Sequence, residues 1–395
     1  MNYIELNNQV IIRDENGKYQ LNKDKEALKS YLEDYIEPKM KKFDNLNDRL
    51  NYLVENDYYS KEILDLYDQY VIDVIYDFIR AKNFKFQSYM SASKFYQNYA
   101  LKSNDGEEIL ENYEDKVLIV ALTLGNGEPK LAKDIAEKLI NQEFQPATPT
   151  FLNAGRARGG KMVSCFLVNV EDSCEGISYA VSSANHLSKI GGGVALNLTR
   201  LRASGESIKG IKGAAGGVMG VAKLLEQSFS YFNQMGARQG AGAVYLNVLH
   251  PDFETLLDSK KINADEKIRL TTLSIGAIIP DKFMELAEKN EKCYAFYPHS
   301  IYQKYGVHLD GIKMDEWYDK LANDDDIEKK EINPRELLTR IAQTQQESGY
   351  PYVVFIDSAN EQHTLKDVGM IKMSNLCCEI FQYQTPSDIK GYGQV

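Results

Sequence analysis

The sequence predicts an α/β protein in which a mainly helical N-terminal domain precedes a domain of alternating strands and helices. Through residues 1–145, apolar side chains recur every three or four positions, which is the period of an amphipathic helix. From residue 146 onward, short apolar runs alternate with helical patterns, and this alternation is typical of parallel strands joined by helices. We therefore expect two domains, at residues 1–145 and 146–395.

The helical period is clearest in the segment KEILDLYDQYVIDVIYDFIRA, residues 61–81. Its spacing predicts a helix with one continuous apolar face. Similar repeats predict four further helices in the N-terminal domain. The apolar face is formed by Ile63, Tyr67, Tyr70, Val71, Val74 and Phe78, and the further helices are expected at about 25–36, 91–101, 113–124 and 129–142.

The second domain begins with the turn residues of QPATPTFLNAGRARGG, followed by an apolar run at 163–170 that predicts a buried strand. A helix should follow, because Asp172 and Ser173 are good N-cap residues. Pro334 favours the first turn of a later helix. We expect further strands at 191–198, 242–249 and 352–357, an apolar segment at 268–280, and helices at 173–190, 220–235 and 334–348.

The composition excludes several classes of protein. Hydrophobic residues make up 43% and charged residues 26% of the 395 residues, and no apolar run is long enough to span a membrane. The first thirty residues carry charges and lack the apolar core of a secretory signal, so we expect a cytoplasmic globular protein. The five cysteines and five histidines lack zinc-site or HExxH spacing, which predicts reduced thiols and no metal site.

The charge is distributed unevenly along the chain. The net charge is −11, yet residues 151–250 hold 10 basic and 5 acidic side chains together with 16 of the 27 glycines. Glycine-rich backbone beside cations suits a close approach to phosphate groups. A long nucleic acid would be repelled by the acidic remainder of the chain. We therefore expect a small anionic ligand.

The segment KMSNLCCEIFQ contains the residues best suited to chemistry. It places Asn375, Cys377 and Glu379 at every second position, so an extended backbone would direct an amide, a thiol and a carboxylate to one side. This set could anchor a polar substrate and supply a reactive sulfur and a base. A buried strand with a structural cysteine explains the same spacing. Cys378 would face the other way and pack.

Other candidate residues allow two interpretations each. Cys165, beside Ser164, is a core residue of a strand or a reactive thiol. The loop TRLRASGESIKGIKGAAGG either touches phosphates or is a solvated surface loop. Asp172 is a helix N-cap or a ribose ligand, and Arg269 is a surface cation or a substrate contact. The cations of the glycine-rich loop are Arg200, Arg202, Lys209 and Lys212.

Taken together, these segments resemble the large, catalytic subunit of class I ribonucleotide reductase, most closely its bacterial and phage class Ib form. QPATPTFLNAG, SCFLVNVEDS, LSKIGGGVALN, RASGESIKGIKG, GAGAVYLN, ADEKIRLTTLSIG, AQTQQESGYPY and IKMSNLCCEIFQ occur in the order of that family. The resemblance runs from near residue 1 to Val395 and covers about half of the family's chain. It implies a shortened remnant of the ATP cone at about 1–45 and the first part of a ten-stranded α/β barrel, incomplete in this chain.

The resemblance also implies roles for individual residues. Cys377 would form the thiyl radical that takes hydrogen from the ribose 3′ carbon, and Glu379 would be the base on the 3′ hydroxyl. Asn375 would bind the substrate, and Cys165 would be one of two reducing cysteines, the second lying beyond this sequence. Further substrate-binding positions match Thr148, Ser164, Gly193 and Leu376, and the allosteric specificity effector site, for a deoxynucleotide or ATP, matches Asp172, Arg202, Lys209 and Arg269.

The implied function is the reduction of ribonucleoside diphosphates to deoxyribonucleotides for DNA synthesis. The implied partners are the C-terminal half of the subunit, a radical-generating metal–tyrosyl small subunit, a glutaredoxin- or thioredoxin-like reductant, and a second copy through helices 173–190 and 219–234. No cofactor bound directly, no nucleic acid and no membrane are expected. Two alternatives remain open: a nucleotide-binding fragment without catalytic activity, and an adenosylcobalamin-dependent reductase.

Overall fold

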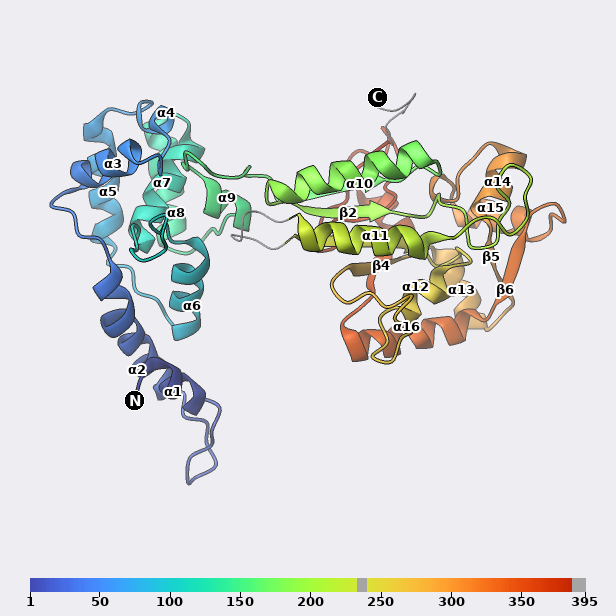
Figure 1. Cartoon of the computed structure of the whole chain (residues 1–395), viewed down its shortest axis with the longest axis horizontal. Helices are drawn as coiled ribbons and strands as arrows, with labels where there is room; N and C mark the ends of the chain where they lie inside the picture. Colours follow the sequence, from blue (N-terminus) through green and yellow to red (C-terminus); the bar gives the residue numbers. More distant parts are fainter. Residues whose placement is uncertain (233–239, 386–395) are drawn as a thin grey trace. The chain divides into compact units, whose positions relative to one another are not determined.

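The computed structural model describes residues 1–232 and 240–385, which fold into two compact units (Figure 1). The first unit comprises residues 1–164, and the second begins at Cys165. Each unit has its own hydrophobic core.

The first unit is helical, as the sequence predicts. Helix α7 (Tyr113–Gly125) is apolar on almost all sides and lies in the centre of the unit, where it packs against α5 (Gln69–Ala81) and α8 (Pro129–Ile140). Asn112 caps α7, because its side chain accepts the backbone N–H of Asp115 at 2.9 Å. The remaining elements are α1 (Tyr3–Gln9), α2 (Asn22–Ser30), η1 (Tyr31–Ile36), η2 (Glu37–Lys39), α3 (Leu46–Glu55), α4 (Lys61–Leu64), α6 (Tyr89–Lys94), η3 (Phe95–Tyr99) and α9 (Thr148–Asn153).

The expected helix at 61–81 is two helices, and its expected apolar face is buried only in part: Tyr67 lies in the core and Ile63 and Val71 pack against it. The chain leaves α4 after Leu64 and enters α5 through Asp68, whose backbone is extended. The apolar positions of α5 therefore do not continue the three- and four-residue spacing of α4. Tyr70 and Val74 are 77% and 41% exposed, and the buried face of α5 consists of Ile72, Ile75, Tyr76 and Ile79.

The second unit is built on a parallel sheet of five strands, which confirms the predicted α/β class. The strand order is β1-β2-β3-β4-β7, so β1 and β7 form the two edges and the sheet does not close into a barrel within the described residues. The strands are β1 (Cys165–Asn169), β2 (Gly193–Asn197), β3 (Gly242–Asn247), β4 (Ser274–Ile279) and β7 (Tyr352–Phe355).

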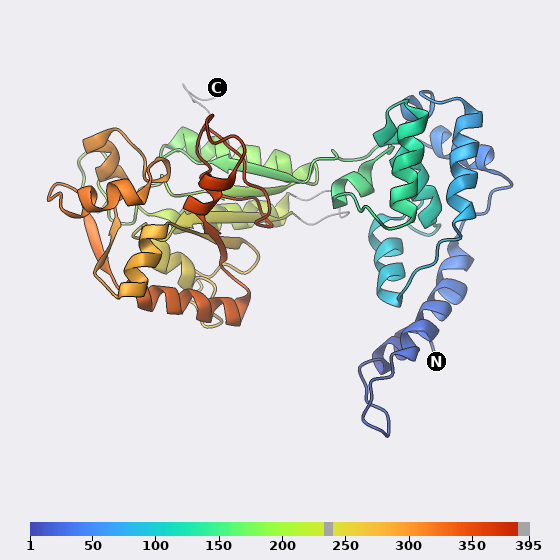
Figure 2. The ribbon, with the colours of Figure 1, turned by 180° about the vertical axis from the view of Figure 1, so that it is seen from behind.

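The two faces of the sheet carry different elements. Helices α10 (Cys174–Lys189) and α11 (Val218–Tyr231) lie along one face, and the C-terminal segment crosses the opposite face (Figures 1 and 2). Side chains alternate accordingly, because successive residues of a strand point to opposite faces. Leu196 and Leu246 face the helices, whereas Ala195 and Tyr245 belong to a small cluster with Met373, Leu376 and Cys378 of the C-terminal segment.

The helices of the second unit agree with the sequence, with one partial exception. The expected helix at 220–235 is α11, and residues 233–235 lie outside the described residues. An insertion between β4 and β7 carries the antiparallel pair β5 and β6. The other elements are α12 (Phe253–Asp258), α13 (Asp281–Lys289), β5 (Cys293–Phe296), α14 (Pro298–Tyr305), η4 (Leu309–Gly311), α15 (Met314–Ala322), β6 (Lys329–Ile332), α16 (Pro334–Ser348) and α17 (Ile356–Gln362).

The boundary between the compact units follows Ser164 rather than residue 145. Helix α9 accounts for the difference, because it packs against α7 and η3 of the helical unit. Phe151 and Ala154 are buried in that unit's core. Within 1–232 and 240–385, every helix is too short or too polar to cross a membrane.

Candidate functional site

The segment that contains Asn375 and Glu379 is a turn, so the prediction of an extended backbone there is wrong. Residues 376–378 form the turn, and Cys378 has a left-handed backbone with φ of 66°. The fully buried Asn375 holds the turn, because its Oδ1 accepts the backbone N–H groups of Glu379 and Ile380, each at 2.9 Å. Tyr245 of β3 donates its hydroxyl to the Asn375 carbonyl at 2.7 Å. The turn is thereby anchored to the sheet.

The turn brings Asn375 and Glu379 together with Cys165. Asn375 Nδ2 donates to Glu379 Oε2 at 2.7 Å and to Cys165 Sγ at 3.1 Å. Cys165 Sγ lies 3.9 Å from Glu379 Oε1. One amide therefore orients both a thiol and a carboxylate, and the thiol makes a long hydrogen bond of 3.9 Å to the carboxylate.

Gly193 and Leu376 lie next to this cluster. Cys165 opens β1 and pairs in register with Gly193, the first residue of β2. A Cβ atom at position 193 would lie 2.6 Å from Leu376 Cδ2, so a larger residue there would have to displace the end of the Leu376 side chain. The structure therefore brings together five of the predicted site residues: Cys165, Gly193, Asn375, Leu376 and Glu379.

The two adjacent cysteines have different surroundings. Cys377 is exposed. Cys378 is half-buried, and its Sγ donates to the Val353 carbonyl of β7 at 3.5 Å. Burial, followed by the nearby thiols of Cys378 and Cys377, raises the pKa of Tyr245. Both thiols thus lie near the phenol that anchors the turn.

Thr148 and Ser164 belong to the helical unit. Thr148 is the first residue of α9, and its hydroxyl lies 3.2 Å from that of Tyr99. Ser164 is the last residue of this unit. Their role in substrate binding remains a prediction.

Asp172 and Arg202 form a pair at the carboxyl ends of β1 and β2. Arg202 Nε lies 3.3 Å from Asp172 Oδ2, and the backbone N–H of Arg202 donates to Asp172 Oδ1 at 3.2 Å. Lys209 is exposed on the following loop and has a left-handed backbone, with φ of 50°. Arg269 is exposed on the segment before β4 and donates to the Ile262 carbonyl at 2.7 Å. Of these four residues, only Asp172 and Arg202 contact each other within the described part of the chain.

Arg200 is not available to bind a phosphate group, because other side chains already occupy its guanidinium group. Its side chain is buried and bonds both carboxylate oxygens of Asp310, at 2.9 and 3.0 Å, and it pairs with Glu171 as well. A buried guanidinium group needs partners of opposite charge, and the two carboxylates supply them. Arg200 therefore fastens η4 to the sheet.

Asp252 is a residue that the sequence analysis missed. Its carboxylate accepts the backbone N–H of Ser204 at 3.1 Å and that of Val218 at 3.0 Å. Ser204 and Val218 flank the part of the loop that holds its glycines, residues 205–217, and a Cβ atom at Gly217 would lie 2.3 Å from the same carboxylate. Asp252 thus closes the loop at its base. No local pattern reveals this role, because the partners lie 48 and 34 residues away.

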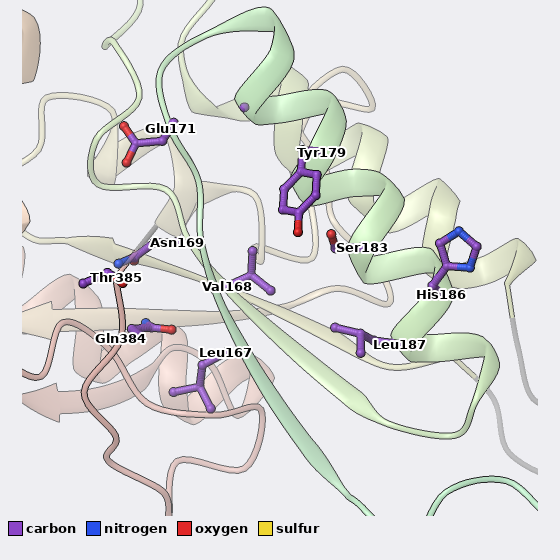
Figure 3. Close-up of a pocket in the computed structure, with 11 residues that line it drawn as sticks. Leu167, Val168, Asn169, Glu171, Tyr179, Ser183, His186, Leu187, Gln384 and Thr385 are labelled. Carbon is purple, nitrogen blue, oxygen red and sulfur yellow. The ribbon is translucent and has the colours of Figure 1, made fainter. Parts of the chain in front are cut away.

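A pocket of about 440 Å³ lies over β1, lined by residues of β1, α10 and the C-terminal segment (Figure 3). Tyr179, Ser183 and His186 come from α10. The amides of Asn169 and Gln384 are buried and have no hydrogen-bond partner in the part of the chain that the structure describes. No group of residues suited to a metal ion is present in that part either.

Comparison with known proteins identifies the family. "Ribonucleotide reductase, barrel domain" matches residues 163–390, "Ribonucleotide reductase N-terminal" matches 3–84, and "Ribonucleotide reductase, all-alpha domain" matches 85–159. The ribonucleoside-diphosphate reductase subunit alpha of Bacillus subtilis is 50% identical over 99% of this chain and 56% of its own length. The corresponding Mycoplasma pneumoniae subunit is 45% identical over 92% of this chain and 50% of its own length.

A phage protein is also similar. The ribonucleoside-diphosphate reductase nrdEB subunit alpha of Bacillus phage SPbeta is 51% identical over 95% of this chain and 35% of its own length. The chain thus spans about half or less of the length of these relatives. The barrel-domain match covers more than half of the chain and agrees with the parallel sheet, and the all-alpha match agrees with the helical unit that precedes it. This chain belongs to the ribonucleotide reductase family.

Proposed function

We propose that this chain supplies the radical cysteine, the base and the specificity site of a class Ib ribonucleoside-diphosphate reductase. The observation that carries the proposal is the cluster of Asn375, Glu379 and Cys165. Asn375 lies 2.7 Å from Glu379 and 3.1 Å from Cys165, and Cys165 lies 3.9 Å from Glu379. Cys377 belongs to the same turn. Because the relatives are about twice as long or longer, the rest of the subunit would act together with this chain.

The proposed reaction begins at Cys377. Its thiyl radical takes a hydrogen atom from the ribose 3′ carbon, and Glu379 accepts the proton of the 3′ hydroxyl. The 2′ hydroxyl is protonated by Cys165 and leaves as water. Cys165 and a second cysteine supply two electrons and become a disulfide, and the proton of the second thiol goes to the 2′ carbon. Glu379 then returns its proton to the 3′ oxygen, and Cys377 returns its hydrogen atom to the 3′ carbon. A glutaredoxin- or thioredoxin-like dithiol reduces the disulfide, which balances the reaction.

Asn375 is the positioning residue of this scheme. Its Nδ2 group donates to Glu379 and to Cys165, so it orients the base and the proton donor toward each other. The exposure of Cys377 in this chain supports a need for the remaining half, because a radical must be shielded from solvent. The radical itself would come from a metal–tyrosyl small subunit.

The proposed specificity site lies around Asp172 and Arg202, with Lys209 and Arg269 on the flanking loops. A deoxynucleoside triphosphate or ATP would bind there, its phosphates held by the cations. Helices α10 and α11, which pack side by side, would form the contact with a second copy of the chain.

The test is reconstitution of the full chain with the complementary half of a class Ib subunit, a class Ib small subunit, a dithiol and cytidine diphosphate. We expect deoxycytidine diphosphate from the unaltered chain and from Cys378→Ser, and none from Cys377→Ser. Equal activity of Cys377→Ser and the unaltered chain would overturn the proposal. Activity that requires added adenosylcobalamin instead of the small subunit would favour the cobalamin-dependent class.

A nucleotide-binding role without catalysis is the second candidate. It is favoured by the contrast between the exposed Cys377 and the intact contact of Asp172 with Arg202. Nucleotide binding by the chain, together with no product under the conditions above, would support this role.

A further inference from the structure

Glu226 is a buried carboxylate that holds the segment between α12 and β4. It lies on α11 and is 4% exposed. Its Oε1 atom accepts the backbone N–H groups of Thr271, Thr272 and Leu273 at 2.6, 2.8 and 3.3 Å. The hydroxyl groups of the two threonines lie 3.4 and 3.3 Å from the same atom. One side chain therefore fixes three consecutive residues directly before β4.

A second contact joins the same helix to the same segment. Lys223, one turn before Glu226, donates to the Glu266 carbonyl at 2.9 Å. Burial alone raises the pKa of Glu226, but the three N–H groups and the charge of Lys223 lower it below its usual value. Glu226 is therefore ionised, and hydrogen bonds to an ionised acceptor are about twice as strong as neutral ones. Helix α11 thus holds the segment on both sides of Arg269.

The segment enters the sheet at the end where Cys165 lies. All five strands are parallel, so their amino ends lie together. Cys165 opens β1, and Ser274, directly after Leu273, opens β4. The pairing register offsets these two first residues by only two positions. A displacement of the segment is therefore felt at the amino ends of the strands, beside the cluster of Cys165.

Helix α11, which lies along one face of the sheet (Figure 1), connects this segment to the glycine-rich loop. The helix begins at Val218, whose backbone N–H donates to Asp252 at the base of that loop. Glu226 follows eight residues later, which is about 12 Å at 1.5 Å per residue. Because a helix moves as a rigid element, a shift of the loop that carries Lys209 reaches the segment of Arg269 through α11.

We propose that Glu226 is a positioning residue that couples the effector site to the selection of the substrate. The inference rests on the proposed function, in which Lys209 and Arg269 belong to the specificity site. A nucleotide that draws in the glycine-rich loop shifts α11, and the carboxylate of Glu226 moves the backbone directly before β4 with it. Arg269 is then presented differently at the amino ends of the strands, so different effectors favour different substrates without any contact between Glu226 and a nucleotide.

The experiment compares Glu226→Gln and Glu226→Met with the unaltered chain in the reconstituted system described above. Four ribonucleoside diphosphates are offered in equal amounts, with dATP, dTTP or dGTP as effector, and the ratio of the products is measured. Glutamine keeps a neutral acceptor, whereas methionine has a similar length and no strong acceptor. We expect the dependence of the product ratio on the effector to fall about threefold in Glu226→Gln and about tenfold in Glu226→Met. Effector affinity without substrate, measured by calorimetry, should stay unchanged.

The control is Glu254→Gln, which loses ion pairs with Lys330 and Arg340 in the same unit and should keep the product ratios of the unaltered chain. If Glu226→Met does not fold, Glu226→Gln decides the question. Product ratios equal to those of the unaltered chain, including an equal loss of every product, would overturn the coupling role of Glu226. Ratios that ignore the effector in the unaltered chain would instead overturn the proposed specificity site, and no product from that chain would count against the proposed function itself.

Discussion

The two units both bury polar side chains but use them differently. In the helical unit, the fully buried Glu111 accepts the hydroxyl of Tyr59 at 2.6 Å and lies 3.1 Å from Arg156 and 3.5 Å from Lys116. In the sheet unit, the buried Asn375 connects groups that remain accessible, because Glu379 is exposed and Cys165 is half-buried. In the first cluster the charged groups pair with one another and hold helices together. The second cluster leaves a carboxylate and a thiol able to react.

The largest effect on stability should come from Glu111→Gln. This change leaves Lys116 and Arg156 without their buried counter-charge, and we expect a loss of about 3–5 kcal/mol in the free energy of unfolding. Urea unfolding of the full chain, followed by circular dichroism, measures it. The control is Glu108→Gln, whose carboxylate pairs with Lys41 near the surface and should have little influence. Similar losses for the two variants would remove the distinction between the units.

Lys116 should make the helical unit sensitive to pH. Burial lowers the pKa of Lys116 to about 7, against about 10.5 in the unfolded chain. Between these values the unfolded chain binds one more proton, so the free energy of unfolding should rise with pH, by at most about 1.4 kcal/mol per unit. Unfolding at pH 7.5 and 9 measures the slope, and Lys116→Met should reduce it. An unchanged slope in that variant would assign the effect to other groups.

Gly193→Ala should strain the turn of the sheet unit. The new methyl group would lie 2.6 Å from Leu376 Cδ2, and we expect a loss of about 1–3 kcal/mol from overpacking. The double variant Gly193→Ala with Leu376→Val should recover part of it. The matched control is Gly220→Ala in α11, where no atom lies within 4 Å of the new Cβ and alanine favours the helix. Equal losses at both positions would contradict the tight contact.

The smallest effect on stability should come from Glu379→Gln, despite its place in the proposed mechanism. The side chain is exposed, so the free energy of unfolding should change by less than about 0.5 kcal/mol. Product formation in the reconstituted system should be lost, because the amide cannot accept the 3′ proton. A stable and fully active variant would remove Glu379 from the reaction.

Sequence reasoning predicted what depends on local pattern. The apolar runs of β2 and β3 identified the strands because both faces of the sheet are covered, one by helices and the other by the C-terminal segment. The phase of α5 was not predictable from spacing, because the helix restarts at Asp68. Asn375 and Glu379 were chosen together, but a turn rather than a strand brings them into contact.

Contacts between distant parts of the sequence could not be predicted. Cys165 meets Asn375 across 210 positions, a separation over which no local spacing links two residues. His299 meets Arg202 across 97 positions. A histidine in the first turn of a helix carries no local signal of such a contact.

The carboxylate of Asp252 has a consequence for the glycine-rich loop between Ser204 and Val218. Because it fixes both ends of the loop, the conformational entropy of the intervening residues is already reduced before any nucleotide arrives. Ligand binding would then have less disorder to remove, and more of the attraction between phosphate and cation would contribute to affinity.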